Sequence, residues 1–221
     1  YYLLAKPDNL HNQFILSKGH GAIAQYIILE ELQVLKKSDI ENYCQSNGIL
    51  GAHPDRGNPG ISASTGSLGH GIGLGVGVSY GNFLQDQKEN VYVLVSDGEL
   101  QEGSSWEAIM MAANLKLNNL VVFVDLNDFG GLHRMSEHHA AFYPLEEKFN
   151  SFGWETKTVN GHEVNECVLA VNNRTRTKPF AVICNTIKGK GVSYMENVPI
   201  WHYRSPNEAE LKLAIDEINK S

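Results

Sequence analysis

The chain has 221 residues, 18 lysines and arginines against 25 aspartates and glutamates, and a formal net charge of −7. This length allows an α/β domain with a buried core, and 42% hydrophobic against 19% charged residues excludes disordered and collagen-like proteins. The acidic balance argues against a nucleic-acid surface, and the apolar runs are too short to cross a membrane. With no signal-peptide pattern and three unpaired cysteines, we expect a reduced, cytoplasmic protein with inert thiols.

The first predicted elements are two helices and a loop. Apolar residues spaced by three and four predict a helix over 20–35. Ser38 can cap a second, short helix, with Glu41 at the capping-box position. Residues 48–64 are rich in Gly, Pro, Asn and Asp, which predicts a loop.

A glycine-rich segment follows over 68–84. Its apolar residues alternate with glycines as in a strand, but four of the glycines are each four residues apart: Gly69, Gly73, Gly77 and Gly81. That spacing puts them on one face of a helix, where small residues let another backbone approach closely. We therefore expect a tightly packed helix.

The rest of the chain alternates strands and helices. Apolar and β-branched runs predict strands over 91–95, 120–124, 154–159 and 179–184. Helices are predicted over 106–117, 145–152, 163–172 and 206–218, the last with Ser205 as N-cap and Pro206 in the first position. This order predicts an α/β fold, a doubly wound, mostly parallel sheet with helices on both faces. Since no linker interrupts it, we expect a single domain over 1–221.

Polar residues follow two of the predicted strands. Asp97 and Gly98 come directly after the strand over 91–95, and Asn127 comes soon after the strand over 120–124. In doubly wound sheets ligands bind at the carboxyl ends of the strands, so these residues would converge if the strands are neighbours. A carboxylate with an amide oxygen suits Mg²⁺ or Ca²⁺, and Gly98 lets a phosphate approach the backbone. Either segment alone reads as a turn, but together they favour a metal–diphosphate site.

These residues resemble a known signature. Asp97-Gly98 with Asn127 thirty residues later is similar to the diphosphate-binding signature of thiamine-diphosphate enzymes, with Ser96 in place of the usual first glycine. Further blocks resemble transketolases, in the same order along the chain: LSKGHG at 16–21, AHPD at 52–55, TGSLGHG at 65–71, DGELQEG at 97–103, and KGKG at 188–191 before Trp201-His202. The short chain and the lysine before Gly19 resemble split transketolases, whose N-terminal subunit carries only the diphosphate-binding (PP) domain.

The resemblance implies the residues that hold the cofactor. Asp97, Asn127 and the backbone carbonyl of Phe129 would ligate Mg²⁺, while Gly98 and Glu99 would lie at the diphosphate of thiamine diphosphate. Three residues would contact cofactor and substrate and move protons at the substrate hydroxyls, namely His20, His53 and His202.

Other residues implied by the resemblance face the pyrimidine ring or a second subunit. Gly66 and Leu68 would contact the aminopyrimidine, and Glu102 would lie at the subunit interface, paired with an acidic residue of the partner. Transketolases carry an S-G-H-P-G-like segment before the SKGH block, and none precedes Phe14 here. We therefore expect that the N-terminal segment of the family is missing from this sequence.

The implied function is transfer of a two-carbon ketol unit from a ketose to an aldose, by a chain active only with a pyrimidine-domain partner in an α2β2 assembly. The altered loop over 127–134 leaves open a dedicated sugar substrate. One alternative is the α subunit of a 2-oxoacid dehydrogenase, which shares the diphosphate signature. Another is a dinucleotide-binding oxidoreductase, since residues 19–24 fit G-x-G-x-x-A and Asp39 follows about twenty residues later. A third is a non-catalytic subunit with the same fold.

Overall fold

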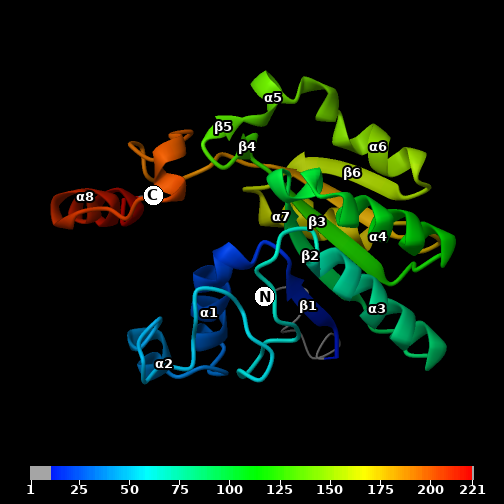
Figure 1. Ribbon diagram of the computed structural model, residues 1–221, viewed down its shortest axis with the longest axis horizontal. Helices are drawn as coiled ribbons and strands as arrows, with labels where there is room; N and C mark the ends of the chain where they lie inside the picture. Colours follow the sequence, from blue (N-terminus) through cyan, green and yellow to red (C-terminus); the bar gives the residue numbers. More distant parts are fainter. Residues whose placement is uncertain (1–10, 221) are drawn as a thin grey trace.

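A five-stranded parallel sheet forms the centre of the protein (Figure 1). The computed structural model describes residues 11–220, so the first residues, in which no signal peptide is predicted, lie outside this range. Across the sheet the strands are, in spatial order, β1 (Gln13–Leu16), β2 (Val91–Ser96), β3 (Leu120–Leu126), β7 (Phe180–Asn185) and β6 (Glu155–Asn160). Every neighbouring pair is parallel, which confirms the predicted sheet. The four predicted strands agree within two residues at each end, and β1 was not among them.

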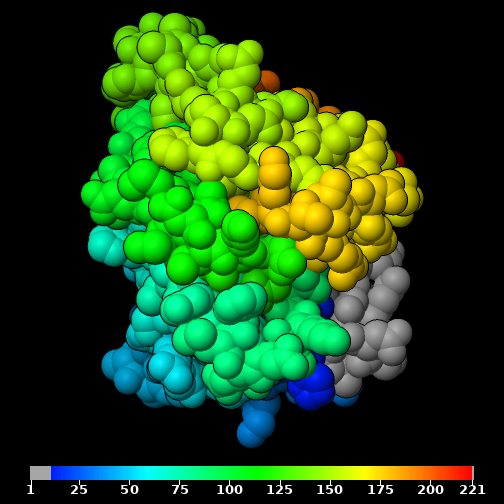
Figure 2. Space-filling view, turned by 90° about the vertical axis from the view of Figure 1, so that its right-hand side faces the viewer, coloured from blue at the N-terminus to red at the C-terminus, as the bar shows by residue number. Residues whose placement is uncertain are grey.

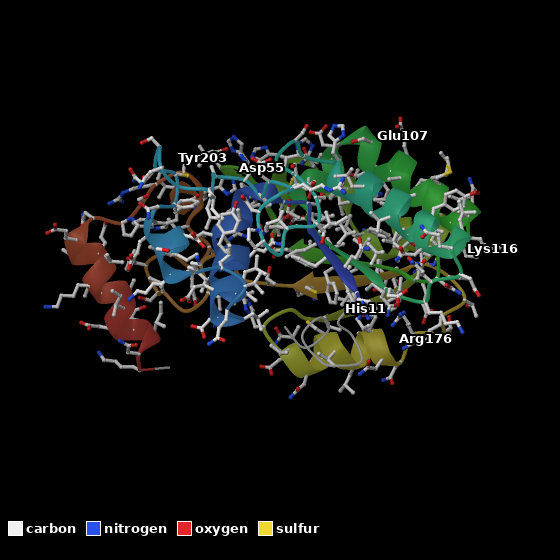
Figure 3. The ribbon with its side chains drawn as sticks, turned by 90° about the horizontal axis from the view of Figure 1, so that it is seen from below. His11, Asp55, Glu107, Lys116, Arg176 and Tyr203 are labelled. Atoms are coloured by element: carbon white, nitrogen blue, oxygen red, sulfur yellow. The ribbon has the colours of Figure 1, made fainter. Side chains whose placement is uncertain are left out.

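Helices cover both faces of the sheet, as predicted. The main ones are α1 (Ala22–Glu31), α3 (Gly71–Leu84), α4 (Gly103–Asn114), α6 (Leu145–Ser151), α7 (Val164–Asn172) and α8 (Glu208–Ile218). Side chains of α3, α4 and α6 pack on one face of the sheet, and those of α7 pack on the other. Figure 3 shows the green pair α3 and α4 on one side and the yellow α7 on the other. No helix in the described part of the chain is long and apolar enough to cross a membrane.

Short elements complete the chain. They are η2 (Gly19–Gly21), α2 (Lys37–Glu41), η3 (Gly98–Gln101), the hairpin of β4 (Phe129–Gly130) and β5 (His133–Arg134), α5 (Met135–His138), η4 (Ala140–Phe142) and η5 (Pro199–His202). The β4–β5 hairpin and α5 directly follow β3, so this region lies at the carboxyl end of the sheet.

The glycine-rich segment is helical, but its close contacts involve other glycines than predicted. A Cβ on Gly75 would lie 2.4 Å from Cγ2 of Val93, and one on Gly71 would lie 2.3 Å from Oγ of Ser17. These two glycines let α3 lie directly on the sheet. By contrast, a Cβ on Gly73, Gly77 or Gly81 would meet nothing within 4 Å. The predicted small-residue face of α3 is therefore open in this chain.

Two helix starts were predicted wrongly. Helix α2 begins after Lys36, whose N–H donates to the Asp39 carboxylate at 2.9 Å, so Ser38 lies inside the helix and Glu41 takes no part in its cap. Helix α8 begins after Asn207 rather than Ser205, because the Asn207 side chain accepts the N–H of residue 210 at 2.9 Å. In both cases a second cap-forming residue within two positions makes the better hydrogen bond.

Candidate active site at the carboxyl end of the sheet

Four neighbouring strands deliver polar side chains to one edge of the sheet. After β1 come Lys18 and His20, and after β2 comes Asp97. After β3 comes Asn127, and after β7 comes Lys188. Figure 3 shows Asp55 and Tyr203 at this end of the molecule, far from Lys116 and Arg176 at the opposite end. The carboxyl ends of the strands are therefore where the candidate site lies.

Asp97 is the centre of this edge. Its carboxylate is fully buried, with Oδ1 accepting the Gly98 N–H at 2.8 Å and Oδ2 accepting the Asp128 N–H at 2.7 Å. The second bond comes from the segment after β3, so the structure confirms that the two strand ends converge. Burial raises the pKa of Asp97 to about 6, although the two backbone donors oppose this shift.

Two more oxygen atoms lie beside Asp97. A Cβ on Gly98 would lie 3.3 Å from the Phe129 carbonyl oxygen, so this carbonyl approaches the Gly98 backbone directly. The Asn127 side chain accepts the Phe129 N–H at 3.0 Å and donates to Oδ2 of Asp125 at 3.2 Å, which fixes its amide orientation. A carboxylate, an amide oxygen and a carbonyl are the hard donors that Mg²⁺ takes, so these residues fit the expected metal.

A buried ion pair beside Asp97 was missed by the sequence analysis. Lys18 forms a salt bridge with Asp125, and the Thr186 hydroxyl donates to the other oxygen of the same carboxylate at 2.5 Å. Although burial opposes ionisation, the Lys18 charge holds the pKa of Asp125 below its ordinary value. This network joins the ends of β1, β3 and β7. Its only signal in the sequence was the lysine of the SKGH block.

Histidines and a lysine form a cationic cluster beside Asp97. The rings of His20 and His202 are 5.6 Å apart, and Lys188 Nζ lies 3.0 Å from Nδ1 of His202. His53 packs against Gly66, where a Cβ would lie 3.0 Å from the imidazole ring, and the Tyr26 hydroxyl holds the His53 carbonyl at 2.8 Å. The three predicted histidines therefore come together, and Lys188 is an addition that sequence reasoning missed.

The electrostatics of this cluster favour an anion. Partial burial, followed by the charges of Lys18, His202 and Lys188, lowers the pKa of His20 to about 4. Burial and then the nearby Lys18 charge also lower the pKa of Lys188. An anionic ligand would reverse both shifts, because it favours the charged forms of these groups.

The His20 imidazole of the chain without ligands is expected to titrate near pH 4 instead of 6.5, and inorganic diphosphate is expected to raise this pKa. Proton NMR of the imidazole from pH 7.5 to 3.5 measures both values. Because folding lowers this pKa, the contribution of neutral His20 to stability is present above about pH 6.5 and is lost as the pH falls toward 4. His20→Asn should flatten that part of the stability profile, whereas His139→Asn, at an exposed position, should not. An apo titration near pH 6.5 would contradict the assignment.

Other predicted residues have distinct places. Gly66 has φ +147° and lies against Gly19, where a Cβ would lie 2.9 Å from the Gly66 N atom. Leu68 is 39% exposed and Glu102 is exposed as the residue before α4. Glu102 also contacts Gly69, where a Cβ would lie 2.5 Å from the Glu102 Cβ. Leu68 and Glu102 are therefore available to another molecule.

Glu99 is not available to a ligand, contrary to the prediction that it contacts the cofactor. Its side chain is fully buried, and the carboxylate accepts hydrogen bonds from the Ser17 hydroxyl and from the Gly69 N–H at 2.9 Å. Burial raises the pKa of Glu99, and these donors oppose the shift. Glu99 thus organises the backbone around the site from inside.

The dinucleotide alternative loses its support in the structure. The segment 19–24 does follow a strand and lead into α1, as that motif requires. However, Gly19 packs on Gly66 of the protein itself, and Asp39 caps α2 instead of ending a second strand. The glycines therefore serve contacts within the chain.

Comparisons with known proteins agree with this site. The family described as transketolase, thiamine diphosphate binding domain, matches residues 6–216. One of the two subunits of an apulose-4-phosphate transketolase from Actinobacillus succinogenes is 36% identical over 207 residues, which are 93% of this chain and 75% of that protein. A 6-deoxy-6-sulfo-D-fructose transketolase subunit of Clostridium sp. is 33% identical over 230 residues, covering all of this chain and 83% of that protein.

A solved structure leads to the same family. Transketolase from Campylobacter jejuni superimposes with a TM-score of 0.81 at 26% identity, over 94% of this chain and 34% of that chain. The matched part is thus one portion of a longer enzyme. By its sequence, its parallel sheet and the residues gathered at the strand ends, this chain belongs to the transketolase family and is a thiamine diphosphate binding domain of it.

Proposed function

We propose that this chain is the diphosphate-binding subunit of a split transketolase, which transfers a two-carbon ketol unit from a ketose to an aldose. The observation that supports this most is the buried Asp97 with its oxygen neighbours directly beside the cationic cluster of His20, His202 and Lys188. The first group suits a divalent cation and the second suits a diphosphate. Two relatives of similar extent are named as transketolase subunits, which supports a split enzyme.

The chain's own residues would bind the cofactor in a fixed orientation. Asp97, Asn127 and the Phe129 carbonyl would hold Mg²⁺, while Lys188 and His20 would neutralise diphosphate charge. Bound thiamine diphosphate supplies the nucleophilic carbon for cleavage of a ketose carbon–carbon bond. Exposed Leu68 and the Gly66 backbone would lie at the pyrimidine ring.

Three histidines would move protons at the substrate hydroxyls. The lowered pKa of His20 keeps its imidazole neutral at pH 7, so it can accept a proton from a hydroxyl group. His202 also has a lowered pKa, from burial and then the Lys188 charge. His53 is held by its backbone and by Gly66, which places it on the loop facing the other two.

The partner subunit would bind the open face of α3 and the neighbouring part of α4, here called the α3–α4 surface. It contains the three open glycines of α3 and exposed apolar side chains: Gly73, Gly77, Gly81, Tyr80, Leu84, Met110 and Met111. Figure 2 shows α3 and α4 side by side at the surface. Glu102 lies at the start of α4, where it would meet an acidic residue of the partner. An apolar surface of this kind marks a protein–protein interface.

Reconstitution tests this function. The chain with thiamine diphosphate, Mg²⁺ and a panel of sugar phosphates and sulfo-sugars should transfer no ketol unit alone, and should do so when its partner is added. The relatives are named for a sugar phosphate and a sulfo-sugar, which supports an anionic sugar as substrate. Full activity of the single chain would contradict the split enzyme, and pyruvate decarboxylation by the assembled enzyme would favour the 2-oxoacid dehydrogenase alternative.

A further inference from the structure

The segment 128–143 is tied to the buried carboxylate of Asp97 by two residues to which no role has been assigned. The first is Asp128, which has a left-handed backbone with φ +67°. This conformation, which aspartate tolerates better than most residues, turns the Asp128 N–H toward Oδ2 of Asp97 at 2.7 Å. The side chain of Asp128 remains free to bind another part of the segment.

The Asp128 carboxylate holds the beginning of α5 and the end of the β4–β5 hairpin. It accepts hydrogen bonds from the Ser136 N–H at 2.8 Å and the Ser136 hydroxyl at 2.7 Å, and it forms a salt bridge with Arg134 at 3.2 Å. The Asp128 carbonyl also accepts the Met135 N–H at 2.9 Å. One residue thus fixes both strands of the turn that follows Asn127.

Tyr143 closes the far end of the same segment. Its hydroxyl lies 3.3 Å from Oδ1 of Asp128 and 3.4 Å from Oδ2 of Asp97, so one donor faces two carboxylates. The ring is packed beside the main core and against Phe142, 5.6 Å between centroids, which fixes where the hydroxyl points. Oδ2 of Asp97 therefore faces two donors, whereas Oδ1 accepts only the Gly98 N–H.

We propose that Asp128 and Tyr143 are positioning residues, which hold Oδ2 of Asp97 so that Oδ1 is the oxygen presented to the metal. This inference rests on the proposed function, since it concerns the carboxylate that would bind Mg²⁺. It makes metal binding depend on the order of the whole segment 128–143, because the hydrogen bonds to Asp97 come from its two ends. Partners of metal ligands that act in this way typically change metal affinity 10- to 100-fold.

The test is Tyr143→Phe in the enzyme assembled with its partner subunit. The concentration of Mg²⁺ that gives half-maximal thiamine diphosphate binding is measured by titration calorimetry, with the unfolding temperature of each free chain measured beside it. We expect about a tenfold increase in that concentration for Tyr143→Phe. The control is Tyr194→Phe, which removes a hydroxyl that donates to the Glu210 carbonyl at 2.7 Å and does not contact Asp97, and which should leave the concentration unchanged.

A second variant separates positioning from folding. Asp128→Gly keeps the left-handed backbone but removes the carboxylate, so it should raise the Mg²⁺ requirement in the same direction. In the double variant the two effects should not add, because both act through the orientation of Asp97. If the unmodified enzyme binds thiamine diphosphate independently of Mg²⁺, the proposed function itself fails. If it binds as expected but Tyr143→Phe behaves like Tyr194→Phe, the positioning role alone is overturned.

Discussion

Asp97→Asn is expected to abolish Mg²⁺-dependent binding of thiamine diphosphate, with a loss of affinity of about 100-fold or more. The substitution removes the only charged group among the proposed metal ligands. It also places an amide NH₂ against a backbone N–H, because both oxygens of Asp97 accept backbone donors. An unsatisfied buried donor of this kind costs about 1–3 kcal/mol, so the free chain should be less stable as well.

Asp97→Ala distinguishes the two effects, since it removes the carboxylate without the opposed donors. Both variants should lose cofactor affinity in titration calorimetry with the partner present, while circular dichroism reports whether the chain is folded. Asp216→Asn on the exposed surface of α8 is the matched control and should bind as the unmodified chain does. Unchanged affinity in a folded Asp97→Ala chain would remove Asp97 from the site.

Gly77→Phe is expected to prevent assembly with the partner subunit while leaving the chain folded. A side chain at Gly77 meets nothing within 4 Å in this chain, so the ring would project from the α3–α4 surface and block the partner's approach. Sedimentation velocity of the mixed subunits measures the loss of the complex, and ketol transfer should fall with it. A normal complex from Gly77→Phe would mean that the partner binds elsewhere.

Three further variants make this result specific. Gly77→Ala should raise the stability of the free chain by about 0.5–1 kcal/mol, because alanine is the better helix former. Gly75→Ala should lower it by about 1–3 kcal/mol, since its Cβ would lie 2.4 Å from Val93. Asn172→Phe places the same ring on α7, on the other face of the sheet, and should leave assembly intact.

The sheet and the convergence of its strand ends could be predicted because they depend on local patterns. The core strands are runs of buried apolar residues, and parallel strands place their carboxyl ends together wherever they pair. For this reason Asp97 could be placed beside the segment after β3 without coordinates. The helix starts at Ser38 and Ser205 were wrong because several residues near each end can form a cap, and only the backbone geometry selects one.

Contacts between residues far apart in the sequence could not be predicted. Lys18 and Asp125 are 107 positions apart, and Asp125 lies inside a strand, where a single acidic residue gives no sign of a partner. The role of Glu99 was misread for the same reason, because its donors come from Ser17 and Gly69 on other segments. The alternation of open and packed glycines along α3 likewise depends on where the sheet lies, which the spacing of glycines alone does not reveal.

The buried carboxylate of Glu99 has a consequence for the motions of the site. It accepts hydrogen bonds from the end of β1, from the loop before α3 and from the end of β2, through Ser17, Gly69 and Ser96. Releasing any one of these segments leaves a buried charge with too few donors, so they open as one cooperative unit. The histidine loop and the metal-binding turn therefore share a single local unfolding equilibrium, and their amide protons should exchange with solvent at matching rates.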